Sequence, residues 1–216
     1  MNQELKPIPG SYRKWGFAAI IGCASQALIH VSSGAGWISI IVEHGIATIL
    51  IFGSVTMLAH AALKLASGHF RWPFCGTLLV AVSCQIAFYS QRNALFFYGY
   101  QKYVDGSLRQ VEPAMDALVE ANRTDILNRS NMDRLRIVSP LLKGIPQRSE
   151  WRDFAAASGC GKNAISYCVV FHSWNRIWGS GFGCFEAFGT RLSEMTIKSI
   201  DSTHFIFSGP YHDQVL

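Results

Sequence analysis

The first half of the chain has very little charge. Charged residues make up 15% of the sequence, against about 25% in soluble proteins, and the deficit is concentrated in residues 15–91. The fixed charges there are Glu43, Lys64 and Arg71. A soluble domain with such a stretch would expose more apolar surface than water tolerates. The lack of charge therefore excludes an ordinary soluble enzyme and a disordered chain, and it predicts an integral membrane protein.

Motifs of catalysis and metal binding are also lacking. No Cys-x-x-Cys pair occurs, so a structural zinc site and a thioredoxin-like site have no support. Residues 159–162 match the end of a phosphate-binding loop, but Ala156 and Asn163 stand where that motif requires Gly and Ser or Thr. No serine–histidine–acid set is recognisable. We therefore expect a protein that is not an enzyme and holds no metal or other cofactor.

The positive charge of the chain does not indicate nucleic acid. The formal net charge is +5 at pH 7, but the sequence has no run of five or more basic residues and no nucleic-acid motif. The basic residues instead flank the apolar runs, as they do in membrane proteins. The expected partners are the lipid bilayer and other integral membrane proteins, including a second copy of the chain, and not nucleic acid.

Apolar runs predict three transmembrane helices. Residues 15–42 carry no formal charge and exceed one bilayer crossing at 1.5 Å per residue. The small residues 32–36 are therefore expected to form a turn. The expected helices are residues 15–31, 37–65 and 72–91, within a transmembrane domain that covers residues 15–100.

Basic residues set the expected orientation. The leader, residues 1–14, contains Lys6, Arg13 and Lys14, whereas the turn at 32–36 contains none. Cytoplasmic loops carry an excess of Lys and Arg. With three crossings, the leader is expected in the cytoplasm and the C-terminal half outside, in a bacterial inner membrane.

The second half of the chain is expected to be helical and partly membrane-associated. Residues 101–162 are polar, and Val104, Leu108 and Met115 follow a helical spacing, so this part is predicted as a helical extramembrane region. Residues 163–216 are rich in glycine and aromatic residues and are predicted to associate with the membrane. The predicted fold class is thus an all-α integral membrane protein.

Residues 163–185 leave an alternative open. They are predicted as an interfacial or re-entrant segment, because Arg176 in the middle of a span would be costly. A fourth transmembrane span is the alternative. The tail beyond them alternates weakly around Phe205 and Phe207, which is compatible with a short hairpin.

Two groups of residues are candidates for sites. Gly179-x-x-x-Gly183, flanked by Arg176 and Glu186, would let a partner helix approach closely; a local loop held by an ion pair is the alternative. Glu43 and His44 are the most distinct polar residues of the membrane half. An ionisable residue inside a transmembrane span usually has a functional role. The alternative is that the helix begins at residue 45 and that both residues lie among the lipid headgroups.

Three cysteines of the polar half are candidates for a disulfide. These are Cys160, Cys168 and Cys184. A pair among them would form if this half faces an oxidising compartment, and the third would be left over.

These features favour a non-enzymatic accessory protein of an envelope complex. Such a chain would bind other membrane proteins through its helices, as a secretion- or conjugation-type subunit or as an immunity or exclusion factor. The alternative is a small redox or proton-handling membrane protein. It would use His30 and His44 as ligands or Glu43 as the titrating group.

Overall fold

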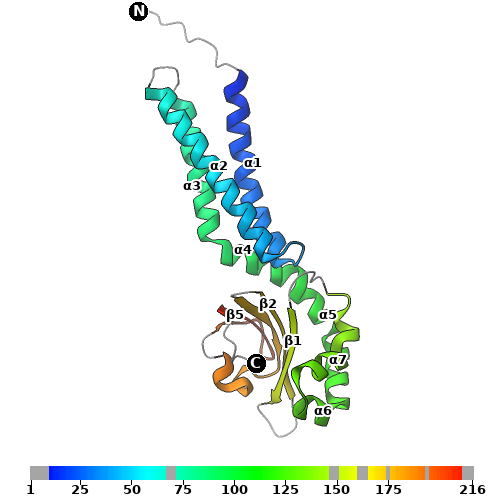
Figure 1. The fold of residues 1–216 in the computed structure, drawn as a ribbon. Helices are drawn as coiled ribbons and strands as arrows, with labels where there is room; N and C mark the ends of the chain where they lie inside the picture. The colour runs from blue at the N-terminus through cyan, green and yellow to red at the C-terminus, as the bar shows by residue number, and fades with distance from the viewer. Residues whose placement is uncertain are drawn as a thin grey trace, which may run out of the picture. The chain divides into compact units, whose positions relative to one another are not determined.

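The chain divides into two compact units, Met1–Tyr100 and Gln101–Leu216, called here unit 1 and unit 2 (Figure 1). The computed structural model describes residues 10–66, 72–145, 151–159, 165–173, 176–192 and 195–210. Most of the predicted leader, and Cys160, lie outside the described residues. Each unit is described separately below.

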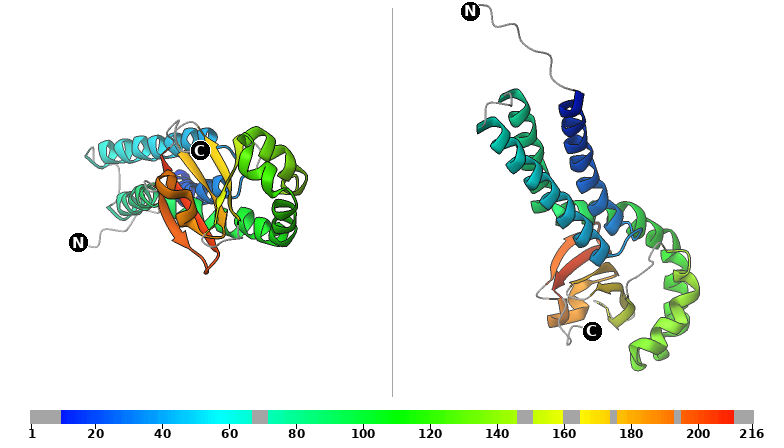
Figure 2. Two further views of the ribbon diagram at one scale, coloured as in Figure 1. Left: turned by 90° about the horizontal axis from the view of Figure 1, so that it is seen from below. Right: turned by 45° about the horizontal axis from the view of Figure 1, so that its top comes forward.

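Unit 1 is a bundle of helices. It contains α1 (Gly10–Gly34), α2 (Ile40–Ala66), α3 (Trp72–Ser90) and α4 (Arg92–Gly99). Helix α1 packs against the other three, and α2 packs against α3 (Figures 1 and 2). The turn after α1 is closed by hydrogen bonds from the amides of Gly36 and Trp37 to the carbonyls of Ser33 and Ser32, and Gly36 takes a positive φ of 74°, which favours glycine.

The polarity of unit 1 is inverted relative to a protein folded in water. Large apolar side chains point outward, among them Phe17, Leu28, Ile49, Phe52 and Leu79, which are 56–75% exposed. The buried interior holds alanines and a few larger apolar residues such as Leu78, together with the polar side chains of Gln26, His30, Glu43 and Gln85. Soluble proteins place such apolar residues inside and rarely expose them in contiguous groups. An apolar exterior suits contact with lipid or with another apolar helix.

The prediction of three transmembrane helices is wrong. By length and composition, two helices among the described residues could cross a membrane, over Phe17–Gly34 and Ile40–Leu63. The apolar stretch described within α3 is the shorter Leu78–Ser90. Absence of charge had predicted the third span, but a crossing also needs about 20 predominantly apolar residues. The expected orientation placed the leader in the cytoplasm and the C-terminal half outside. It was inferred from three crossings, so it is no longer supported.

Unit 2 overturns the all-α fold class, because it contains an antiparallel sheet of five strands in the order β1-β2-β3-β5-β4. The strands are β1 (Trp151–Ser158), β2 (Ile165–Ser173), β3 (Arg176–Phe182), β4 (Thr196–Ser199) and β5 (His204–Pro210). Residues 163–185, predicted as an interfacial segment or a fourth span, supply β2 and β3. The short hairpin expected in the tail around Phe205 and Phe207 is formed by β4 and β5.

The strands were missed because their pattern does not alternate. Residues 167–171 of β2 are all buried, so both faces of the strand are covered and its apolar run is continuous. A short continuous run cannot be distinguished from a buried helix by periodicity. The glycines at 179 and 181, which weaken a helix, are strand residues here.

Helices and the sheet form layers in unit 2. The remaining elements are the π-helix η1 (Tyr100–Asp105), which contains the division between the units, then α5 (Gly106–Ala121), α6 (Arg123–Asn128), α7 (Asn131–Leu142) and the 3₁₀ segment η2 (Phe185–Leu192). Helix α5 continues through Pro113. Helices α6 and α7 pack against β1. Asp116 of α5 accepts a hydrogen bond from β2, and Asp105 at the end of η1 bonds to side chains of β3 and β5.

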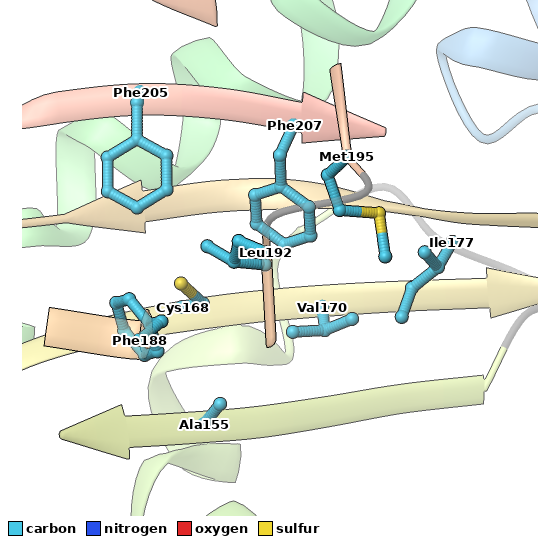
Figure 3. Close-up of a cluster of buried hydrophobic side chains, with 9 residues drawn as sticks. All are labelled: Ala155, Cys168, Val170, Ile177, Phe188, Leu192, Met195, Phe205 and Phe207. Carbon is cyan, nitrogen blue, oxygen red and sulfur yellow. The ribbon is translucent and has the colours of Figure 1, made fainter. Parts of the chain in front are cut away.

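An apolar cluster covers the opposite face of the sheet. It combines side chains from four strands with Phe188 and Leu192 of η2 (Figure 3). Two aromatic residues of β5 lie directly opposite glycines of β3: Phe207 pairs with Gly179, and Phe205 with Gly181. A Cβ atom on Gly181 would overlap the ring of Phe205. The glycines therefore provide the space that the two rings fill.

Gly181→Ala should destabilise unit 2 by about 1–3 kcal/mol, as overpacking of a buried site usually does. The Phe205 ring cannot turn away freely, because the side chain is 2% exposed. Gly144→Ala is the matched control, since no atom lies within 4 Å of its added Cβ. Thermal unfolding of the detergent-solubilised chain measures both. Equal stability of the two variants would contradict the packing described.

Candidate functional site

One face of α1 carries the polar interior of unit 1. Gly22, Gln26, His30 and Ser33 recur every three or four residues, so they lie on the same side of the helix. All four are buried, with exposed fractions of 0% for Gln26 and 1% for His30. This face is directed into the bundle, and it brings hydrogen-bonding groups where apolar packing is expected.

A histidine–glutamate pair joins α1 to α2 within the bundle. The Nδ1 atom of His30 lies 2.6 Å from Oε1 of Glu43, and the two side chains are 1% and 2% exposed. Glu43 stands in the first turn of α2, where the partial positive charge of the helix N-terminus favours a carboxylate. The carboxylate thus has two sources of stabilisation, the histidine and the helix end.

Gln26 is the second partner of the His30 imidazole. Its Nε2 atom lies 3.3 Å from Nε2 of the imidazole. With the amide in this orientation its nitrogen donates, so the imidazole Nε2 accepts and Nδ1–H donates to Glu43.

Several buried polar atoms of unit 1 have no hydrogen-bond partner among the described residues. They are Oε1 of Gln26, Oγ of Ser33 and Oε2 of Glu43. Gln85 of α3 is 1% exposed and lies against Gly22, because a Cβ there would be 2.6 Å from its Nε2. Each unpartnered atom costs about 1–3 kcal/mol. Buried polar groups left in this way point to a function or a bound molecule.

The pair holds the carboxylate of Glu43 away from water. A charged group buried in this way is costly unless it is paired and hydrogen-bonded, and His30 supplies that partner. Tyr89 of α3 completes the surroundings, with its ring centroid 6.2 Å from that of His30.

The structure separates the two predicted intramembrane residues. Glu43 is buried in the pair with His30. His44 is exposed, and its Nδ1 bonds instead to the carbonyl of Ile40, 2.8 Å away in the preceding turn. His30 and His44 are therefore not brought together as ligands. In the described part of the chain, no group of three His, Cys, Asp or Glu side chains could hold a metal ion.

The four predicted partner-binding residues do not form one surface. Gly179 is a strand residue under the Phe207 ring, Arg176 begins the same strand, and Gly183 follows it with a φ of 92°. Glu186 is exposed in η2. The Gly-x-x-x-Gly argument applies to helices, so it has no physical basis in this strand.

The predicted disulfide residues have different states. Cys184 is disulfide-bonded, and Cys168 is a free, buried thiol. Burial raises the pKa of Cys168 well above its usual value. Oε2 of Glu186 lies 2.7 Å from Sγ of Cys184, but a disulfide sulfur has no proton to donate, so this contact is not a hydrogen bond.

Unit 2 has a second polar cluster, where α5 meets the sheet. Tyr167 donates to Asp116 at 2.6 Å. Burial raises the pKa of Tyr167, and this bond raises it further. Burial also raises the pKa of Glu112, with Asp116 adding to the effect. A raised carboxyl pKa favours folding below the unfolded pKa, and that contribution is lost as pH rises through the folded pKa.

Deeper in unit 2, Asp105 is shared by two partners. Oδ1 of Asp105 lies 2.6 Å from the Ser180 hydroxyl and 2.8 Å from Nε2 of His204. All three residues are at most 2% exposed. The cluster ties the start of α5 to β3 and β5, which is a structural role.

Sequence reasoning missed most of the site in unit 1. It named His30 only as a ligand of the redox alternative, and it did not use Gln26 or Gln85. The available signal was the recurrence of Gln26 and His30 four residues apart in an apolar helix, since polar side chains inside a membrane helix face its partners. The pairing of His30 with Glu43 depends on how α1 and α2 pack.

His30→Ala should destabilise unit 1 by about 1–3 kcal/mol, because Glu43 would remain buried without its partner. His44→Ala is the matched control and should change stability by less than about 0.5 kcal/mol, as exposed substitutions do. Titration of the purified protein with denaturing detergent measures both. Replacing His30 and Glu43 together should recover part of the loss. Similar unfolding of the two single variants would rule out a stabilising pair.

Native protein treated with a maleimide at pH 8 should leave both Cys168 and Cys184 unmodified, for different reasons. The Cys168 thiol is buried and its pKa is raised, whereas Cys184 has no free thiol. Of these two cysteines, Cys168 alone should react after denaturation without reductant. After denaturation and reduction, both should react. Peptide mass spectrometry distinguishes them. Modification of Cys184 before reduction would contradict the disulfide.

Comparison with known proteins assigns no family. No protein-family model matches the chain, and neither a curated protein nor a solved structure matches it. What the site does must therefore be argued from its own geometry.

Proposed function

We propose that this chain is an integral membrane protein of the bacterial inner membrane and a non-enzymatic accessory subunit of an envelope complex. It would act by binding other membrane proteins, as a secretion- or conjugation-type subunit or as an immunity or exclusion factor. One observation carries the proposal: unit 1 has an apolar exterior and buries charged and polar side chains, among them His30 and Glu43, inside. That distribution is stable in a bilayer and costly in water.

The exposure of α2 supports the membrane location. In its apolar window only 11% of the residues are buried within the structure. The core helix of a soluble protein would be mostly buried, so α2 must be covered by something else. Lipid and the helices of a partner are the coverings that match its apolar surface.

Small residues on α2 support a role in binding. Gly45 and Gly53 are exposed, and no atom lies within 4 Å of a Cβ added at either. They are eight residues apart, so they lie about two turns apart along the helix and about 80° apart around it. Glycines on an outward face let the backbone of another membrane helix approach closely.

The disulfide of Cys184 supports an external location for unit 2. Disulfides persist in oxidising compartments such as the bacterial periplasm and are rare in the cytosol. A folded domain held there by membrane helices is accessible to partners on that side of the membrane.

A second candidate function, proton handling in the membrane, is favoured by the His30–Glu43 pair. Ionisable residues inside a membrane bundle often serve in proton relays, and this pair is buried at 2.6 Å. The redox form of this alternative has no such support, because His30 and His44 do not share a site.

Gly45→Leu combined with Gly53→Leu should abolish the native complex while the protein still inserts, because the added side chains block the approach of a partner helix. Gly76→Leu is the matched control on α3, since Gly76 is equally open. Native gel electrophoresis of mildly solubilised membranes, together with carbonate extraction, measures both properties. Release of the chain by carbonate would refute the membrane location, and a lone monomer in native membranes would refute the accessory role.

A further inference from the structure

We propose that a cleft in unit 2, between α5 and one end of the sheet, binds the guanidinium group of an arginine side chain from a partner protein. The cleft has a volume of about 350 Å³, which is near the lower end of the range for ligand sites and suits a single side chain. The inference rests on the proposed accessory role, because it names the chemistry by which a partner would be recognised.

Both walls of the cleft belong to unit 2. Residues 112, 116, 119 and 120 of α5 form one wall, and their spacing of three or four residues places them on one side of the helix. The other wall is the end of the sheet at which β2 begins, β3 ends and β5 begins. It is formed by Ile165, Tyr167, Phe182, Gly183 and Thr203.

The α5 wall is acidic. Its carboxylates are those of Glu112, Asp116 and Glu120, and no basic side chain is among the described residues that line the cleft. Like charges four residues apart on a helix repel each other. Burial raises the pKa of Glu112, and the charge of Asp116 raises it further. A cation bound between the carboxylates would offset this repulsion.

Two of these carboxylates are available to a ligand. Glu112 is half-buried and has no hydrogen bond or ion pair with another described residue. Glu120 is paired with Arg123 at 3.1 Å, but the glutamate side chain is 60% exposed, and such surface pairs stabilise little. Asp116 already accepts a hydrogen bond from Tyr167. Glu112 and Glu120 would therefore accept the N–H groups of the ligand.

The sheet wall is apolar. A row of stacked rings crosses four strands, with centroids 5.1–5.5 Å apart, and consists of Phe154, Tyr167, Phe182 and His204. Tyr167 and Phe182 have a ring on each face, so the cleft meets their edges. A guanidinium group is planar and weakly hydrated, and it binds carboxylates through two parallel hydrogen bonds. It therefore suits a cleft with one acidic and one apolar wall.

A buried atom without a partner lies next to the cleft. His204 is 1% exposed; it follows Thr203 in the chain and stacks on Phe182, and both of these residues line the cleft. Its Nε2 lies 2.8 Å from Asp105, whereas its Nδ1 has no hydrogen-bond partner among the described residues. When Nε2 carries the ring proton, Nδ1 accepts only. The missing partner is then a donor, as guanidinium is, and such unsatisfied groups point to a bound molecule.

Nuclear magnetic resonance of the full chain in lipid nanodiscs tests the chemistry of the cleft. The probes are ethylguanidinium and ethylurea, which have the same shape but differ in charge. Ile165 lines the cleft, and Ile177 lies in the apolar cluster on the opposite face of the sheet. We expect ethylguanidinium to shift the methyl signal of Ile165 in a saturable way and to leave that of Ile177 unchanged. Ethylurea should bind at least about tenfold more weakly.

Neutralising the acidic wall provides a matched comparison. Glu112→Gln combined with Glu120→Gln should weaken ethylguanidinium binding at least about tenfold. Asp125→Asn combined with Asp133→Asn removes the same charge from α6 and α7 and also breaks surface ion pairs, so it should change binding less than about twofold. An unchanged Ile177 signal shows that a variant is folded. Equal weakening by both combinations would mean that net charge alone attracts the probe, and it would overturn the proposal.

Native gel electrophoresis of membranes that contain the same variants identifies the source of the cation. We expect the complex to be lost with Glu112→Gln and Glu120→Gln and to persist in the control. If ethylguanidinium binds but the complex persists in both, the cleft takes a free small cation and a partner's arginine is ruled out. If ethylguanidinium binds no better than ethylurea, the inference is wrong, while a complex that depends on Gly45 and Gly53 leaves the accessory role intact.

Discussion

The cost of a carboxylate inside an apolar bundle organises unit 1. Glu43 cannot stay buried alone, so α1 must present His30 to it at 2.6 Å. That contact fixes how α1 and α2 face each other. Gln26 of α1 and Gln85 of α3 are buried in the same bundle. Large apolar side chains such as Ile49 and Phe52 are left on the exterior.

A different constraint organises unit 2, namely the fit of aromatic rings over glycines. Phe205 and Phe207 of β5 occupy the space that Gly181 and Gly179 leave on β3. The other face of the sheet carries buried aromatic rings, such as the stacked Phe154, Tyr167 and Phe182. On the same face Asp105 is shared by Ser180 and His204. Unit 2 therefore keeps its apolar side chains inside, as a domain surrounded by water does. The opposite polarity of the two units is consistent with two different surroundings for one chain.

Much of unit 1 follows from the sequence, whereas much of unit 2 does not. The long helices of unit 1 are determined locally, since residues 15–31 and 37–65 are apolar and lack helix-breaking prolines. The strands β2 and β3 contain apolar runs and glycines that a single sequence cannot distinguish from an interrupted helix. Their pairing joins residues that are distant in the sequence, such as Gly181 and Phe205. No local pattern records that pairing.

The site shows the same division between composition and packing. The sequence by itself determined that Glu43 lies in an apolar segment, because scarcity of charge is a property of composition, and it determined that such a residue needs a partner. Only the tertiary structure decided that the partner is His30 rather than the adjacent His44. Neighbours in a helix point about 100° apart, so His44 turns outward while Glu43 faces α1. The packing of α1 against α2 then brings together two residues that no spacing rule connects.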